Sequence, residues 1–246
     1  MCGIFGAISN KVINEKNLRS IAMHSRQRGK NYSGLVYYNE NDYRIARADY
    51  DIAKILSKEK WIDSSVVMGQ SSPISDGLLN NQPVVNDGIF VIHDDIIVNE
   101  KEICNYLNIK QGYKIDSELI IEITLKHLEE GGDYKELPQR ILSLCEGTIS
   151  AILALPKIGK ALLFSNNGSL YVGKRKSDTY FASERYPLNC IACDEISQIW
   201  QEGIIVDIPK AKTIDVVDDI QQKKDKHIPK FKNLAAEESM LQYHKP

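Results

Sequence analysis

The sequence has almost no excess of charge of either sign. Among its 246 residues, 31 Lys and Arg stand against 33 Asp and Glu, a formal net charge of -2. That balance gives no broad basic surface for nucleic acid or an anionic membrane. The sequence also lacks an apolar run of the ~18 to 20 residues that span a bilayer, and its start lacks the basic and apolar segments of a signal peptide. We therefore expect a cytoplasmic protein without nucleic-acid or membrane partners.

Cysteine is sparse as well. The five cysteines are odd in number and too few for a disulfide framework in a chain of this length, which fits a reducing compartment. Cys190 and Cys193 have the spacing of half a zinc site, but no second pair of ligands stands at zinc-ribbon distance. We therefore expect no metal site, and we expect both cysteines to be small buried residues.

The apolar pattern predicts many short strands around two or three helices. Gly3–Ile8 is short, apolar and bounded by turn residues, which favours a buried strand. Asp116 begins the clearest helix, because its side chain can cap and an apolar stripe follows as far as Leu128. The other predicted strands are 35–38, 66–68, 89–92, 96–98, 149–155, 161–165, 170–173, 180–183 and 204–208, and the other helices are 17–24 and 135–145. This order indicates an α+β protein with layered sheets and helices.

Cys2 gains chemical interest if Met1 is removed, because one residue then carries both a thiol and a free α-amino group. The α-amino group titrates near ~7.7 to 8.0 and the thiol near ~8.5, so the amine can take the thiol proton at neutral pH. Taken alone, however, a small residue after Met1 is common, and most such cysteines have no catalytic role.

Several segments, in the same order, resemble the motifs of class II glutamine amidotransferases, whose nucleophile is an N-terminal cysteine. They are Cys2-Gly3-Ile4-Phe5-Gly6, Gln27-Arg28-Gly29, 69–77, Asn80-Asn81-Gln82-Pro83, 91–99, Ile115-Asp116-Ser117-Glu118 and Glu146-Gly147. Segments 167–170, 181–184 and 202–203 are most similar to the glutaminase half of glucosamine-6-phosphate synthase. We therefore expect a glutaminase domain over residues 1–220. We expect residues 221–246 to form a linker-like tail, which resembles the lead-in to a sugar isomerase domain.

The resemblance implies a fold, a reaction and a set of site residues. The fold is the four-layer αββα sandwich of N-terminal-nucleophile hydrolases. Cys2 attacks the side-chain amide of glutamine, and the ammonia passes to a synthase or isomerase partner that acts on a sugar phosphate, in amino-sugar biosynthesis by analogy. No cofactor is required, and an oligomer is compatible with the sequence. The implied catalytic positions are Cys2, Asp94 and Asp95, and the implied substrate-binding positions are Arg28, Ser72, Gln82, Asn99 and Asp116.

Three of these positions depart from the family pattern. Ser72 replaces the arginine that binds the α-carboxylate of glutamine. Its loss predicts affinity lower by one to two decades unless Arg26 or another cation compensates, because a hydrogen bond to a charged group contributes ~1.5 to 3 kcal/mol. Asp94 and Asp95 replace the asparagine and glycine of the oxyanion hole, where losing one donor costs ~2.7 to 4 kcal/mol. Only a protonated Asp94 could donate there.

Three functions remain open from the sequence. The first is a working glutamine amidotransferase, since Cys2, Arg28, Asn99 and Asp116 persist. The second is a catalytically impaired domain that binds a partner or ligand without hydrolysis. The third is an N-terminal-nucleophile amidase for another amide that lacks a free α-carboxylate.

Overall fold

A computed structural model gives the fold and describes residues 2–73, 81–113 and 115–219. The tail predicted over residues 221–246 lies outside these ranges, so the division into a domain and a tail stays a prediction. None of the described helices is long and apolar enough to cross a membrane.

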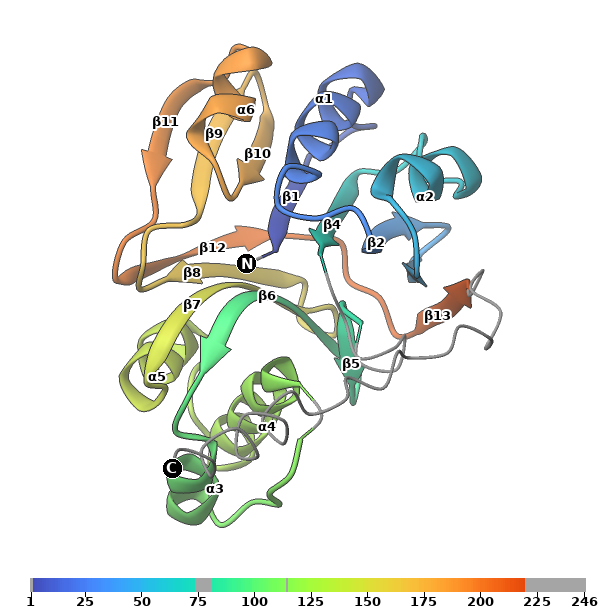
Figure 1. The fold of residues 1–246 in the computed structure, drawn as a ribbon. Helices are drawn as coiled ribbons and strands as arrows, with labels where there is room; N and C mark the ends of the chain where they lie inside the picture. Colours follow the sequence, from blue (N-terminus) through green and yellow to red (C-terminus); the bar gives the residue numbers. More distant parts are fainter. Residues whose placement is uncertain (1, 74–80, 114, 220–246) are drawn as a thin grey trace, which may run out of the picture.

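Two β-sheets form the body of the protein (Figure 1). One has eight strands in the order β11-β9-β10-β1-β4-β2-β3-β13, and the other has five in the order β12-β8-β7-β6-β5. The strands of the first sheet are β1 (Gly3–Ile8), β2 (Tyr32–Asn39), β3 (Asp42–Ala48), β4 (Val66–Ser72), β9 (Tyr171–Arg175), β10 (Asp178–Ala182), β11 (Asp194–Gln198) and β13 (Ile214–Asp219). Those of the second are β5 (Val84–Asn86), β6 (Ile89–Ile97), β7 (Gly147–Leu155), β8 (Lys160–Ser165) and β12 (Glu202–Asp207). The first strand of the chain therefore lies inside the larger sheet, between β4 and β10.

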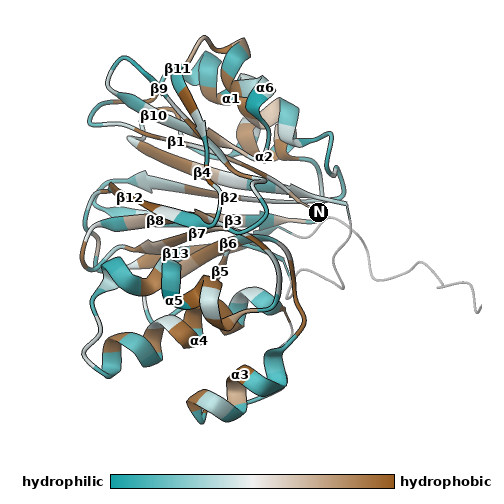
Figure 2. Ribbon diagram, turned by 90° about the vertical axis from the view of Figure 1, so that its left-hand side faces the viewer, coloured by the Kyte–Doolittle hydropathy of each residue, from teal (hydrophilic) through white to brown (hydrophobic). Residues whose placement is uncertain are grey.

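Helices cover the outer face of each sheet, and the two sheets face each other between them (Figure 2). The helices on the larger sheet are α1 (Glu15–Ser25), α2 (Ile52–Lys58) and α6 (Arg185–Cys190). Those on the smaller sheet are α3 (Glu100–Leu107), α4 (Asp116–Glu129) and α5 (Leu137–Leu144), the last preceded by the 3-10 helix η2 (Tyr134–Glu136). The predicted four-layer αββα sandwich is confirmed.

Strand alternation explains why the start of the chain meets the middle of β6. Ile4 of β1 points into the layer between the sheets, as do Phe90 and Ile92 of β6, and these side chains are at most 1% exposed. Side chains alternate with a period of two, so the same inner faces carry Cys2 and Asp94. Because burying each such apolar side chain contributes ~1.5 to 3 kcal/mol, the core between the sheets keeps these two residues facing each other.

β6 differs from the strands predicted there. The apolar runs 89–92 and 96–98 are expected as separate strands, but one continuous strand passes through Asp94 and Asp95. Aspartate is uncommon in strands, because it competes for backbone hydrogen bonds and is costly to bury. The strand continues here because distant residues bind the Asp94 side chain.

Two local predictions are wrong. Asp116 does not cap α4: Ile115 occupies the capping position, and the Asp116 carboxylate reaches the backbone of β6 instead. Cys190 is exposed at the end of α6 rather than buried, while Cys193 is half-buried. Both errors arise because the apolar pattern shows the type of an element but not which tertiary neighbour each side chain meets.

Candidate functional site

Cys2 immediately precedes β1, and the residues that follow it are closely held. The N–H of Ile4 donates to Ser183 Oγ at 2.8 Å. A Cβ added at Gly3 would lie 2.4 Å from the carbonyl oxygen of Ser25 at the end of α1. Only glycine permits this approach, which is why a glycine directly follows Cys2.

Asp94, on the smaller sheet, contacts the Cys2 backbone at the start of β1 in the larger sheet. Its side chain is 0% exposed. One carboxylate oxygen accepts a hydrogen bond from the Cys2 nitrogen, and the other accepts from Arg28 Nη1 at 2.9 Å. Arg28 Nη1 also donates to the Cys2 carbonyl oxygen at 3.4 Å. Because both oxygens of Asp94 accept, the carboxylate is arranged to hold a donor or a cation rather than to donate to an oxyanion.

Arg28 joins this buried carboxylate to one at the surface. Its Nη2 and Nε donate to Glu184 Oε1 at 2.7 and 3.0 Å. The Arg28 side chain is 17% exposed and that of Glu184 57%, so the Arg28–Glu184 pair contributes little to stability. Loss of Arg28, in contrast, would leave Asp94 as an uncompensated buried charge. The next residue fixes the turn, because a Cβ on Gly29 would lie 2.1 Å from the carbonyl carbon of Ser72.

A row of polar side chains crosses the smaller sheet beside Asp94. Ser150 of β7 lies opposite Asp94, and Ser165 of β8 lies opposite Ser150, so all three side chains share one face of the sheet. Both serines are fully buried. Asn167 Oδ1 accepts from their hydroxyls at 2.8 and 3.0 Å. This row cannot be predicted from the sequence, because isolated serines are recognised as neighbours only once the strand register is known.

Ser72 and Gln82 organise the backbone around the site. Ser72 ends β4, is 6% exposed, and accepts a hydrogen bond from the Asn31 N–H through its carbonyl at 3.1 Å. Gln82 Nε2 donates to the His93 carbonyl at 2.8 Å, and Gln82 Oε1 accepts from the His93 N–H at 2.5 Å. Gln82 therefore holds β6 one residue before Asp94.

Asn99 and Asp116 lie where β6 ends. Asn99 Nδ2 donates to the Leu144 carbonyl at 2.9 Å, and its Oδ1 accepts from the Glu146 N–H at 2.8 Å. Asp116 Oδ2 accepts from the Ile97 N–H at 2.8 Å. Burial raises the pKa of Asp116, although that hydrogen bond acts in the opposite direction. Both side chains therefore anchor the loop structure at the end of the strand.

The structure brings only some of the predicted site residues together. Cys2, Arg28 and Asp94 are in direct contact. Asp116 binds three residues farther along β6, which is ~10 Å from Asp94 at the usual rise of a strand. The backbone of Asp95 continues β6 and pairs with β7, and its side chain is outside the described part of the structure.

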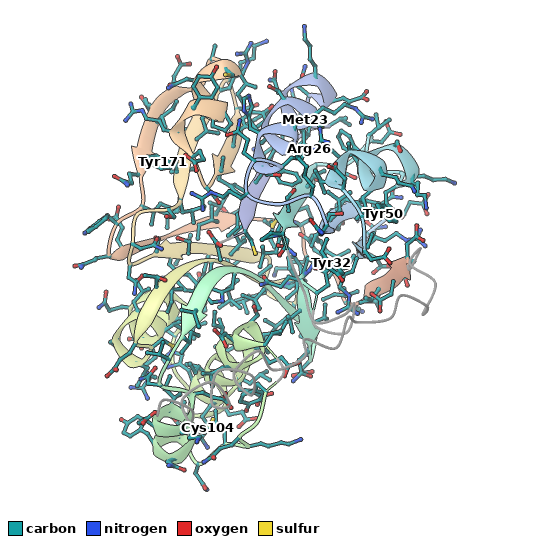
Figure 3. All side chains as sticks on the ribbon, in the orientation of Figure 1. Met23, Arg26, Tyr32, Tyr50, Cys104 and Tyr171 are labelled. Carbon is teal, nitrogen blue, oxygen red and sulfur yellow. The ribbon has the colours of Figure 1, made fainter. Side chains whose placement is uncertain are left out.

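The structure also describes the environments of His93, Arg26 and Cys104. Burial lowers the pKa of His93 to about 4, so its imidazole is neutral. Arg26, considered above as a replacement cation, binds Asp51 through Nε at 2.6 Å on the side of α1 and α2. Cys104 lies on α3, on the opposite side of the molecule (Figure 3). Among residues 2–73, 81–113 and 115–219, no group of three or more His, Cys, Asp or Glu side chains could hold a metal ion.

One small hollow lies beside the cluster. The hollow lined by Gly3, Arg28 and Glu184 has a volume of only about 10 Å³, room for no more than one water. A larger cavity of about 490 Å³ lies at the other end of β1, beside Ile8, and its size would suit a small molecule. Cys2 does not line that cavity, so the reacting groups, rather than the cavity size, locate the site.

Comparison with curated proteins identifies relatives of low identity. No protein-family model matches the chain. The chain is 22% identical over 197 residues to a glutamine–fructose-6-phosphate aminotransferase (isomerizing) of Rhizobium leguminosarum bv. viciae, covering 76% of this chain and 32% of that enzyme. It is 23% identical over 228 residues to an amidophosphoribosyltransferase of Pasteurella multocida, covering 81% of this chain and 44% of that enzyme. The chain therefore spans less than half the length of these relatives.

Solved structures share the fold. A glutamine phosphoribosylpyrophosphate amidotransferase from B. subtilis matches 84% of this chain and 47% of its own, with a TM-score of 0.67 and 16% identity. A glutamine aminotransferase class-II domain protein from Silicibacter pomeroyi matches 84% of this chain and 99% of its own, with a TM-score of 0.50 and 11% identity. At these identities the likeness establishes the fold alone, and the predicted fold is confirmed.

Proposed function

We propose that this chain is an N-terminal cysteine amidohydrolase that releases ammonia from glutamine. The chain is related by sequence and fold to class II glutamine amidotransferase domains, as its motifs predict. The observation that carries this proposal is the contact between the Cys2 nitrogen and the Asp94–Arg28 ion pair. The group that would act as base is held by buried charges at the start of a central strand.

Removal of Met1 turns the Cys2 nitrogen into a primary amine beside its own thiol. The amine takes the thiol proton, and the thiolate attacks the side-chain amide carbon of glutamine. The carbon–nitrogen bond breaks, and the departing ammonia takes the proton back from the ammonium. Water then attacks the γ-glutamyl thioester with the amine again as base, which releases glutamate and restores the thiol.

The donors for the developing oxyanion differ from the family pattern. Asp94 accepts hydrogen bonds and does not donate them, so we assign the stabilising charge to Arg28, whose Nη1 lies 3.4 Å from the Cys2 carbonyl oxygen. A guanidinium in a partly buried site stabilises negative charge strongly, and removal of one such group costs ~2.7 to 4 kcal/mol of transition-state stabilisation. The backbone N–H of Asp95 is the second proposed donor.

The proposed substrate site extends along β6 from Cys2 to Asp116. Asp116 would bind the α-amino group of glutamine, while Gln82 and Asn99 keep the strand and the following loop in place. The ammonia would pass to a synthase partner. A sugar phosphate is the proposed acceptor because one relative is named for fructose 6-phosphate, and residues 221–246 would lead toward that partner.

A second candidate function is hydrolysis of an amide without a free α-carboxylate. Ser72 offers no cation for such a carboxylate, and Ile96, which shares the face of Asp94 two residues along β6, is 57% exposed. An apolar side chain on the strand face that carries the proposed substrate site favours an apolar substituent over a charged one.

Release of glutamate from glutamine by protein lacking Met1 tests the primary function. We expect turnover by the wild-type protein and none by Cys2→Ala. Equal inactivity of the two, with Met1 removed, contradicts the proposal. Release of acid from N-acylated or apolar amides, with no release from glutamine, would instead support the second candidate.

A further inference from the structure

Asp94 holds the group that the reaction uses as base. Its oxygens bind the Cys2 nitrogen on one side and Arg28 Nη1 on the other, and its side chain is 0% exposed. In the chain with Met1 this nitrogen is an amide. Once Met1 is removed, the same position carries an α-amine that accepts a proton, and the buried carboxylate becomes its direct counter-ion.

We propose that Asp94 is a positioning residue that orients the Cys2 α-amino group and stabilises its protonated form after it has taken the thiol proton. This rests on the proposed function and adds a third member to the pair formed by thiol and amine. The arrangement parallels the serine hydrolase triad, in which a buried aspartate orients the histidine base and stabilises the cation that forms.

The proton balance assigns no proton to Asp94. In the first half-reaction the proton moves from Cys2 Sγ to the α-nitrogen and then to the departing ammonia. In the second, a proton moves from the attacking water to the α-nitrogen and then to Sγ. Asp94 remains ionised throughout, because Arg28 continues to donate to its second oxygen. The aspartate therefore supplies charge and geometry, which an asparagine of the same shape supplies only in part.

The charged groups around the Cys2 nitrogen explain why the carboxylate matters. Arg28 approaches from the turn after α1, and Glu184 approaches from the end of β10 and binds Arg28. His24 of α1 lines the adjacent hollow. Without Asp94, an ammonium on residue 2 would lie beside the Arg28 guanidinium, and the remaining carboxylate, Glu184, is more than half exposed. Protonation of the amine would then be opposed by a like charge.

Titration of the α-amine tests this role without any substrate. The Cys2→Ala protein, with Met1 removed, keeps the backbone nitrogen and has no thiol to interfere. The rate of acetylation of its N-terminus by acetic anhydride is followed against pH by peptide mass spectrometry. We expect a midpoint at least ~1 pH unit above that of the same chain in guanidinium chloride, where the amine has its ordinary pKa of ~7.7 to 8.0.

Variants locate the source of the shift. Asp94→Asn in this background should lower the midpoint by ~1 to 3 units, whereas Glu184→Gln, which removes an equal charge from the exposed side of Arg28, should move it far less. A folded-state midpoint equal to that of the unfolded chain, or an equal effect of the two variants, overturns the role of Asp94. The proposed function fails separately: a raised midpoint without glutamate release rejects glutaminase activity and leaves the pairing intact.

Discussion

Replacing Arg28 by methionine should destabilise the fold through Asp94. The substitution keeps much of the side-chain volume but removes the guanidinium that binds a carboxylate with 0% exposure. In the chain that retains Met1, where the Cys2 nitrogen is an uncharged amide, removing one partner of the buried ion pair costs ~3 to 5 kcal/mol, because the other charge stays buried without compensation. The lost pair with Glu184, which is 57% exposed, adds only ~0 to 1 kcal/mol.

A double-mutant cycle isolates this interaction. Asp94→Asn should cost less than Arg28→Met, ~1.5 to 3 kcal/mol, because Arg28 is partly exposed and keeps Glu184. The double variant should be more stable than the sum of the two losses predicts, by ~2 kcal/mol, because it contains no buried unpaired charge.

Urea unfolding followed by tryptophan fluorescence measures these free energies, because Trp61 is 0% exposed and becomes exposed to water on unfolding, whereas Trp200 is already 56% exposed. Arg44→Met is the matched control: Arg44 pairs with Asp215 at 3.1 Å, but both side chains are at least 44% exposed, so its loss should cost no more than ~1 kcal/mol. Equal losses for Arg28→Met and Arg44→Met, or strict additivity in the cycle, would refute the reasoning.

Three further predictions follow from single contacts. Gly29→Ala places a Cβ 2.1 Å from the Ser72 carbonyl carbon and should lower the free energy of unfolding in urea by ~1 to 3 kcal/mol. Lys30→Ala, at the exposed neighbouring position, should lower it by ~0.5 kcal/mol or less. The pKa of His93 is lowered to about 4, so the unfolded chain binds one more proton than the folded chain as the pH falls from 6.5 toward 4. The free energy of unfolding should therefore drop by up to ~3 kcal/mol over this range, and His93→Phe should flatten this part of its pH dependence. Asp116→Asn should raise the KM for glutamine ~10- to 100-fold with a smaller effect on kcat, and steady-state kinetics that show only a loss of kcat contradict its role in binding.

The sequence predicts the parts of the fold that depend on local pattern. The strand at Gly3–Ile8, the long helix after Ile115 and the α+β layering all follow from apolar periodicity and turn residues. The short helix α3 and strand β3 are not predicted as such, because eight or fewer residues carry too little periodic signal and their burial depends on partners elsewhere.

The sequence likewise predicts some features of the site and not others. The family motifs point to Cys2, Arg28 and Asp94 individually, but their arrangement does not follow from the sequence, because the contacts with Asp94 join residues 66 and 92 positions apart. The expectation that Asp94 acts in the oxyanion hole rests on the family's asparagine. The structure shows that charge pairing with Arg28 makes position 94 an acceptor.

The central claim is that Cys2, freed of Met1, is the nucleophile, and mass spectrometry tests it directly. Protein isolated from its natural source would be incubated with an electrophilic analogue of glutamine, then analysed intact and by peptide mapping. We predict a chain that lacks Met1 and carries one adduct, on Cys2, with no adduct on Cys2→Ala. Retention of Met1, or labelling of another residue in place of Cys2, would contradict the account.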